Sequence, residues 1–253
     1  MKVLKYIKEK AEKEKLHFTL IDLGKQSPQK AAELALIAKK AGTDLIMIGG
    51  SDSVKEEKLN ETVALIKKAT GLYVVLFPSS AKYISLLADA ILFMSLLNSK
   101  KIDYVIGKQV DAALLIKRIN LEMISMGYLV IKPGMRVGKK SKVKLIKRRD
   151  SYLAKKYAVC AETFGMSLFY LEAGSGAPLS VPDGMIKEVK QEIDIPLIVG
   201  GGINDTTTAR KKAEAGADII VTGTILEEDD SRKGEKLARM IKAIKEVKQS
   251  RAF

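Results

Sequence analysis

The chain alternates between short, almost continuously apolar runs and longer amphipathic segments along its whole length. The apolar runs are short enough for strands, and their near-continuous apolarity is typical of strands that are covered on both faces. Eight strands are predicted in this way, at residues 17–22, 44–50, 73–78, 90–98, 128–133, 167–174, 196–202 and 218–224. The segments between and after them predict helices at residues 29–40, 56–68, 109–125, 152–164, 184–192, 206–215 and 234–248.

This order of elements predicts an α/β protein, a single (β/α)8 TIM-type barrel domain spanning residues 1–253. A short internal repeat supports the prediction. Its two copies are Ala-Gly-Thr-Asp-Leu-Ile at 41–46 and Ala-Gly-Ala-Asp-Ile-Ile at 215–220, and each is typical of a helix end followed by a strand start. An open doubly wound sheet is the alternative. It is less favoured because no G-x-G-x-x-G sequence follows the first apolar run.

Two glycine turns near the end of the chain suggest what the barrel binds. Gly200, Gly201 and Gly202 close the seventh run, and Gly223 and Thr224 close the eighth. Glycine lets main-chain N–H groups approach an anion, and the helix that follows adds the positive end of its dipole. Two such turns in consecutive units predict an enzyme for a phosphorylated small molecule, although glycines can also serve only to tighten turns.

The charge balance also favours anionic partners. The chain has 44 Lys and Arg against 30 Asp and Glu, a formal net charge of +14. Aromatic residues do not interleave the densest basic cluster, so we expect no nucleic-acid partner. The cluster is a solvated loop or a peripheral contact with an anionic membrane. The basic linker that contains it, residues 134–150, is either a mobile flap beside the site or a solvated surface crossover. Its members are Lys139, Lys140, Lys142, Lys144, Lys147, Arg148 and Arg149.

Several other classes of protein are disfavoured. The longest uncharged apolar run, 90–97, is far shorter than the roughly 20 residues that cross a bilayer. No export signal is visible, so we expect a cytoplasmic protein. Cys160 is predicted to be a buried small hydrophobe, and His17 is predicted to be structural. With one cysteine and one histidine, a zinc site of the common ligand types is not expected.

In a barrel the chemistry lies where the strands end, so the polar residues at these positions are candidates. Asp22, Ser51, Asn98, Lys132 and Glu172 end or follow predicted strands. Carboxylates and hydroxyls without softer ligands suit Mg²⁺, which often bridges a protein carboxylate to substrate phosphates.

The residues at these strand ends resemble the geranylgeranylglyceryl phosphate synthase family. The resemblance extends over nearly the whole chain in the correct order, and the stretch after the sixth strand is its most distinctive motif. It is carried by Thr-Leu-Ile-Asp at 19–22, Ile-Met-Ile-Gly-Gly-Ser at 46–51, Phe-Met-Ser-Leu-Leu-Asn-Ser at 93–99, Tyr-Leu-Glu-Ala-Gly-Ser-Gly-Ala-Pro at 170–178, Val-Gly-Gly-Gly-Ile at 199–203 and Val-Thr-Gly-Thr at 221–224.

The resemblance implies a Mg²⁺-dependent prenyltransferase of archaeal ether-lipid synthesis. Such an enzyme joins sn-glycerol 1-phosphate to geranylgeranyl diphosphate and works as a dimer or larger homo-oligomer. Asp22 and Ser51 match the Mg²⁺ positions, although Leu23 follows Asp22 where the family commonly has proline. The positions matching the glycerol 1-phosphate site are Tyr170, Leu171, Glu172, Ala173, Gly174, Ser175, Gly176, Gly201, Gly202, Gly223 and Thr224.

Within this set, Glu172 and Tyr170 are the catalytic candidates. We expect Glu172 to hydrogen-bond the glycerol hydroxyls and to accept the proton of the attacking one, with Tyr170 orienting it. The structural alternatives are helix capping by Asp22 or Ser51 and an ion pair between Glu172 and Lys132. An apolar groove for the prenyl tail is expected among Tyr83, Leu86, Leu87, Phe93, Met94, Leu96 and Tyr104, which could also be ordinary packing.

Alternative functions remain open from the sequence. The nearest alternative is the related bacterial type of prenylglyceryl phosphate synthase, which uses a longer prenyl diphosphate. A sugar-phosphate isomerase or aldolase-type barrel could use the same glycine turns. A non-catalytic basic protein that binds RNA or a membrane would need only the positive charge.

Overall fold

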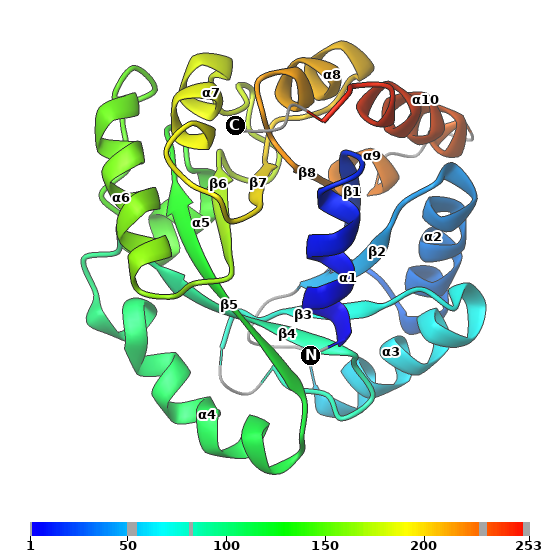
Figure 1. The fold of residues 1–253 in the computed structure, drawn as a ribbon. Helices are drawn as coiled ribbons and strands as arrows, with labels where there is room; N and C mark the ends of the chain where they lie inside the picture. Colours follow the sequence, from blue (N-terminus) through cyan, green and yellow to red (C-terminus); the bar gives the residue numbers. More distant parts are fainter. Residues whose placement is uncertain (1, 50–54, 81–82, 228–231, 250–253) are drawn as a thin grey trace.

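The computed structural model describes residues 2–49, 55–80, 83–227 and 232–249. In these residues eight parallel strands close into a barrel in sequence order, and helices surround it (Figure 1). The strands are β1 Leu16–Asp22, β2 Leu45–Gly49, β3 Val74–Phe77, β4 Ala90–Leu96, β5 Glu122–Val130, β6 Leu168–Glu172, β7 Leu197–Gly200 and β8 Ile219–Thr222. The predicted (β/α)8 fold is therefore confirmed.

The helices follow the strands with some departures from a regular repeat. They are α1 Lys2–Ala11, α2 Pro28–Ala41, α3 Glu56–Thr70, the π-helix η1 Asp103–Gly107, α4 Lys108–Arg118, α5 Met135–Lys140, α6 Ser151–Thr163, α7 Asp183–Lys190, α8 Thr206–Glu214, α9 Thr224–Glu227 and α10 Lys233–Lys245. Between β3 and β4, the described residues 78–80 and 83–89 form turns and no helix. The outer side of β4 therefore lacks the helix that a regular repeat would place before it.

Strand pairing closes the barrel and places all carboxyl ends at one rim. β1 pairs with β2 through Phe18 and Leu45, and with β8 through Leu16 and Ile219. Because every pair is parallel, the residues that follow each strand meet at the same end of the cylinder.

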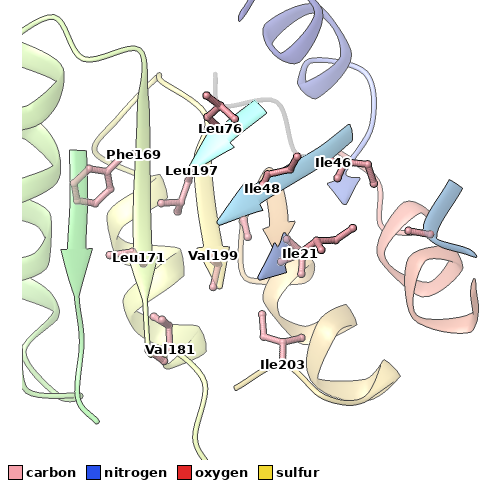
Figure 2. Packing of buried hydrophobic residues seen from close by; sticks show 14 of the residues in the cluster. Ile21, Ile46, Ile48, Leu76, Phe169, Leu171, Val181, Leu197, Val199 and Ile203 are labelled. Carbon is pink, nitrogen blue, oxygen red and sulfur yellow. The ribbon is translucent and has the colours of Figure 1, made fainter. Parts of the chain in front are cut away.

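The core has two layers, since neighbouring strand residues point to opposite faces. Side chains such as Phe18, Met47 and Ile198 fill the inside of the barrel. Figure 2 shows the outer layer, where Ile48 of β2 and Leu171 of β6 pack between strands and helices. Fully burying an aliphatic side chain of this size contributes about 1.5–3 kcal/mol, so the two layers hold the rim in place.

Helix α1 closes the amino end of the barrel. Its apolar face, with Val3 and Ile7, packs against the inner layer. The main-chain N–H groups of Val3 and Leu4 donate to the carboxylate of Glu122, at 2.9 and 3.0 Å. Glu122 begins β5, so α1, dark blue in Figure 1, lies across the amino end. The carboxyl end is left as the open one.

The structure corrects two sequence predictions. The helix predicted at 109–125 ends at Arg118, and β5 begins at Glu122, six residues earlier than the predicted strand. Asn120 has a φ of 55°, a left-handed conformation that ends the helix. Cys160 is exposed, because α6 turns its alanines toward the core instead.

Within the described ranges, the structure contains no helix that is both long and apolar enough to cross a membrane.

Candidate active site

A cavity of about 330 Å³ lies at the carboxyl rim of the barrel. Polar groups from several strand ends border it, including Asp22, Glu172 and Thr224. Apolar residues of β4 and α4, such as Phe93 and Ile116, border it as well. The cavity therefore joins a polar pocket inside the rim to an apolar arm beside β4. The arm lies where the described part of this barrel lacks the helix of a regular repeat.

Glu172, the last residue of β6, is the buried charge of this pocket and is only 7% exposed. The Tyr128 hydroxyl donates to its Oε2 at 3.0 Å, and the Gly174 N–H donates to its Oε1 at 2.6 Å. The Tyr170 hydroxyl is a third donor. Burial raises the pKa of Glu172 above its ordinary value, and the three donors act in the opposite direction.

The predicted alternative for Glu172, an ion pair with Lys132, is wrong in the described structure, where Lys132 is exposed and the hydrogen-bond donors to Glu172 are uncharged. A buried carboxyl with neutral partners and a raised pKa can exchange a proton with a bound hydroxyl.

Two tyrosines form the floor of the pocket. The rings of Tyr128 and Tyr170 lie 5.0 Å apart between centroids, and Phe77 lies 5.7 Å from Tyr128. Burial raises the pKa of both tyrosine hydroxyls well above the ordinary value, so both stay neutral donors. Tyr128 was not among the residues predicted from the sequence to belong to the site. The register between the strands could have indicated it, because Tyr128 of β5 pairs directly with Tyr170 of β6.

The glycine turn after β7 borders the pocket, and its two glycines are required by their surroundings. Gly201 and Gly202 have left-handed φ angles of 83° and 67°. A Cβ atom on Gly201 would overlap Glu172, and one on Gly202 would lie 2.8 Å from the Ala177 carbonyl oxygen. The loop after β6 thus packs closely over this turn, and only glycine fits. The same backbone lines the cavity.

The turn after β8 also faces the pocket. A Cβ atom on Gly223 would lie 2.7 Å from the Leu20 carbonyl oxygen of β1. Gly223 and Thr224 line the cavity, as do Ser175 and Gly176 of the loop after β6. The two predicted turns and the loop after β6 therefore meet at one space.

The other predicted binding residues lie differently. Leu171 and Ala173 are buried in the outer layer, and Gly174 packs against Met135. Their role in binding stays a prediction and would rest on main-chain groups. The start of α8 is already capped, because Asp205 accepts from the Thr208 N–H at 2.8 Å. An anion in the pocket would thus meet the glycine turn before α8 rather than open helix N–H groups.

Asp22 ends β1 and lines the same cavity. Its Oδ1 accepts from the Gly24 N–H at 2.8 Å, and α2 is capped by Ser27, so the alternative that Asp22 caps that helix is wrong. Ser51 lies outside the described residues.

The surroundings of Asp22 decide whether a Mg²⁺ ion fits. Among the described residues no group of three or more His, Cys, Asp or Glu side chains is close enough to form a closed metal site. A half-buried carboxylate at a rim suits Mg²⁺, which is often held by one or two carboxylates together with water and substrate phosphates. The residues present therefore fit this ion.

Basic residues complete the rim. Lys108, Arg136 and Lys140 line the cavity. The Lys108 ammonium donates to the Ser79 carbonyl oxygen at 2.7 Å and lies 4.4 Å from the centroid of the Tyr104 ring. Arg136 and Lys140 belong to α5, within the basic linker at 134–150. The first part of that linker therefore lies beside the site, and its role as a flap stays a prediction.

Some of the residues predicted to line a tail groove border the cavity, and the binding of a prenyl tail there stays a prediction. Phe93, Met94, Leu96 and Tyr104 line the cavity. Tyr83 is buried and donates to the Gly49 carbonyl oxygen at 2.9 Å. Leu86 and Leu87 are exposed and do not line the cavity.

Comparison with known proteins agrees with this geometry. The geranylgeranylglyceryl phosphate synthase of Picrophilus torridus is 49% identical over 90% of this chain and 93% of its own length. The Thermoplasma acidophilum synthase is 47% identical over 98% of this chain and 97% of its own length. A crystal structure of the T. acidophilum (S)-3-O-geranylgeranylglyceryl phosphate synthase, in complex with its substrate sn-glycerol 1-phosphate, matches with a TM-score of 0.94 over 98% of this chain and 100% of that one.

More distant structures share only the barrel. The thiamine phosphate pyrophosphorylase of Pyrococcus furiosus has a TM-score of 0.61 at 13% identity, covering 91% of this chain and 96% of that one. The PcrB family profile matches residues 7–248. From this match and the high identity to the archaeal synthases, the chain belongs to the PcrB family.

Proposed function

We propose that this enzyme transfers the geranylgeranyl group of geranylgeranyl diphosphate to sn-glycerol 1-phosphate, forming geranylgeranylglyceryl phosphate and diphosphate. One observation carries the proposal. The buried Glu172, the glycine turns and an apolar arm border one cavity, in a chain 47% identical to a synthase whose structure holds sn-glycerol 1-phosphate.

The polar pocket supplies the acceptor half of the reaction. The phosphate of sn-glycerol 1-phosphate would bind main-chain N–H groups of the turns at Gly202 and Gly223. The glycerol hydroxyls would then face Glu172 and Tyr170 at the floor. The 3-hydroxyl oxygen forms a bond to C1 of the prenyl chain, the bond between C1 and the diphosphate oxygen breaks, and Glu172 accepts the hydroxyl proton.

The basic rim suits the donor diphosphate. Lys108, Arg136 and Lys140 are the cations that line the cavity and would bind its oxygens. Asp22, with Ser51, would hold Mg²⁺ at the same rim. When bound, Mg²⁺ would neutralise charge on the departing diphosphate.

The apolar arm suits the prenyl tail. Ile91 and Phe93 of β4 line one side, and Ala112 and Ile116 of α4 line the other. Each buried CH2 group contributes about 0.8 kcal/mol, so a tail in this arm would account for much of the donor's affinity. The arm also excludes water from the allylic carbon as its bond to diphosphate breaks.

A product assay tests the proposal. Purified protein is incubated with Mg²⁺, radiolabelled geranylgeranyl diphosphate and either enantiomer of glycerol phosphate, and butanol-extractable product is counted. We expect product with sn-glycerol 1-phosphate. Its absence with both enantiomers contradicts the proposal, and faster turnover of prenyl diphosphates longer than twenty carbons would favour the related long-chain activity.

Self-association is a further part of the proposal. Four apolar side chains recur every four residues from the residue before η1 into α4, and all are more than half exposed. They are Ile102, Ile106, Val110 and Leu114. Contiguous exposed apolar residues commonly mark an interface, and we propose that a second copy covers this stripe. Light scattering measures the mass of the protein in solution. We expect the unchanged protein to have the mass of an assembly and Leu114→Lys to have that of a monomer. A monomer mass for the unchanged protein would contradict the proposal.

Membrane contact is tested separately. The basic linker favours weak contact with the anionic inner face of a membrane, which would keep a cytoplasmic enzyme close to its lipid product. We expect co-sedimentation with phosphatidylserine vesicles that weakens in high salt. No binding at low salt would rule out this contact.

A further inference from the structure

The only histidine of the chain connects the barrel wall to the turn after β8. His17 is fully buried on the outer face of β1. Its Nδ1 lies 2.9 Å from the Thr43 hydroxyl, and its Nε2 lies 2.9 Å from the Thr222 hydroxyl. Thr222 is the last residue of β8 and is followed directly by Gly223.

The direction of this connection is set by the strand register. His17 pairs with Ile220, whereas Thr222 pairs with Thr19, two residues closer to the carboxyl rim. The imidazole ring therefore reaches along the barrel wall toward the rim. Thr222 lines the cavity beside Gly223, so His17 touches a residue of the pocket without bordering the pocket itself.

The other side of the ring is firmly anchored. The Thr19 hydroxyl donates to the Thr43 hydroxyl at 3.0 Å, and Thr43 also lies 3.0 Å from the His17 carbonyl oxygen, to which it donates. The His17 N–H donates to Asp44 at 2.8 Å, and Lys245 contacts the same carboxylate at 2.9 Å. The ring is thus held at a fixed position relative to β1 and β2.

The ring is also uncharged. Burial lowers the pKa of His17 to about 3, the charge of Asp44 opposes this shift, and Lys245 adds to it. A neutral imidazole has one N–H and one lone pair, so it can bond both threonines at once without carrying a charge into the core.

We propose that His17 is a positioning residue for the phosphate of the acceptor substrate. By fixing the Thr222 hydroxyl, it fixes the main chain at Gly223 and Thr224, whose N–H groups are to bind the phosphate. The inference rests on the proposed function for the identity of that substrate. Gly223 already lies tightly against the Leu20 carbonyl, so a small shift of Thr222 would move the turn away from its binding position.

Matched substitutions separate this role from simple packing. His17→Asn keeps a polar atom near Nδ1 and loses the partner of Thr222, whereas His17→Gln keeps one near Nε2. We expect His17→Asn to raise the KM for sn-glycerol 1-phosphate about tenfold with little change in kcat, the scale of one lost buried hydrogen bond. His17→Gln should lie closer to the unchanged protein.

A double-mutant cycle tests the connection itself. Thr222→Val keeps the shape of the side chain and removes its hydroxyl, so it should reproduce the KM of His17→Asn. The two changes together should raise KM no more than Thr222→Val alone. Thr70→Val is the control, since it removes another buried hydroxyl, bonded to the Ile66 carbonyl of α3, and should lower Tm without changing KM.

An NMR measurement needs no turnover. Because there is one histidine, ¹⁵N-histidine labelling gives one pair of ring signals. We expect a single neutral tautomer that does not titrate between about pH 5 and about pH 8, and a shift of the Nε2 signal when inorganic phosphate is added. A ring that titrates near its ordinary pKa, or one unaffected by phosphate, overturns the inference.

The outcomes separate the inference from the proposed function. If the unchanged protein forms product and His17→Asn has the same KM, or the two substitutions are fully additive, the inference is wrong and the function stands. If the unchanged protein forms no product, the function is wrong, and the phosphate-induced NMR shift still decides the role of His17.

Discussion

Both ends of the barrel hold buried carboxylates, and Asp44 and Glu172 lie in very different surroundings. Asp44, at the amino end and 3% exposed, contacts the ammonium groups of Lys10 and Lys245 and the N–H of His17. Glu172, at the carboxyl end and 7% exposed, receives hydrogen bonds from two tyrosines and a main-chain N–H. One buried charge is balanced by cations, and the other is surrounded by neutral donors.

This difference shows where the fold is stabilised and where it is prepared for chemistry. A carboxylate paired with cations has no remaining demand for a proton or a ligand, so its contribution is to stability. A carboxyl group buried without a cation has a raised pKa and can take a proton from a substrate. Helix α1 closes the first end, while the second end keeps a cavity.

The largest effect should come from removing the carboxyl-end charge. We expect Glu172→Gln to lower turnover by at least about 100-fold, because an amide cannot accept the hydroxyl proton. Its Tm should not fall, since a neutral side chain of the same shape suits a buried site with neutral donors. Product counting and thermal melts of the same preparation check both expectations, and near-normal turnover would remove Glu172 from the mechanism.

Asp22→Asn tests a second carboxylate that lines the cavity at the carboxyl end. We expect turnover to fall by about 100-fold at low Mg²⁺, because a neutral amide is a weaker ligand for the ion. Raising the Mg²⁺ concentration should restore part of the rate. A rate that is independent of Mg²⁺ in both proteins would show that Asp22 has another role.

Replacing Asp44, the buried carboxylate at the amino end, should lower stability rather than turnover. We expect Asp44→Asn to lower the free energy of unfolding by about 2 kcal/mol, because two lysines and the His17 N–H lose a charged acceptor. Turnover per folded molecule at saturating sn-glycerol 1-phosphate should be retained. Urea unfolding measured beside product formation tests this, and the comparison between the two ends fails if activity falls while stability does not.

A smaller effect should appear in the pH dependence of stability. The pKa of Glu172 is raised on folding, so between its unfolded and folded values the native state binds one more proton than the unfolded state. The stability of the protein relative to Glu172→Gln should therefore fall as pH rises from about 4.3 through the folded pKa, and then level off. Urea midpoints of the two proteins across pH measure this difference, and a parallel pH dependence would contradict it.

The fold was largely predictable because each strand is a separate apolar run. The prediction failed where the local pattern was ambiguous. Residues 119–125 continue the apolar spacing of α4, and only the left-handed Asn120 shows that the helix has ended. Cys160 was predicted to be buried because its neighbours are apolar, yet the buried face of α6 consists of Ala154, Ala158 and Ala161.

Site residues at the ends of strands could be predicted from the sequence. Site residues whose role depends on contacts with neighbouring strands or helices could not. Asp22 and Glu172 end strands, both glycine turns follow strands, and all of them border one cavity. Tyr128 lies within a strand, so its contact with Glu172 depends on the register between β5 and β6. Lys140 was visible only as a member of a basic cluster, and Arg136, which also lines the cavity, was not singled out from the sequence. Ser51 lies outside the described residues, and its role stays a prediction.

In the proposed function the turn after β7 holds the acceptor phosphate. Alanine substitutions at two matched glycines test this. Gly202 and Gly71 have nearly equal left-handed φ angles of 67° and 65°, so alanine strains both similarly. A Cβ atom on Gly202 would press on the loop after β6, whereas one on Gly71, between α3 and β3, would meet no atom within 4 Å.

Titration calorimetry with sn-glycerol 1-phosphate compares the two variants directly. We expect Gly202→Ala to abolish binding and Gly71→Ala to bind as the unchanged protein does. Equal binding by Gly202→Ala and the unchanged protein would contradict it.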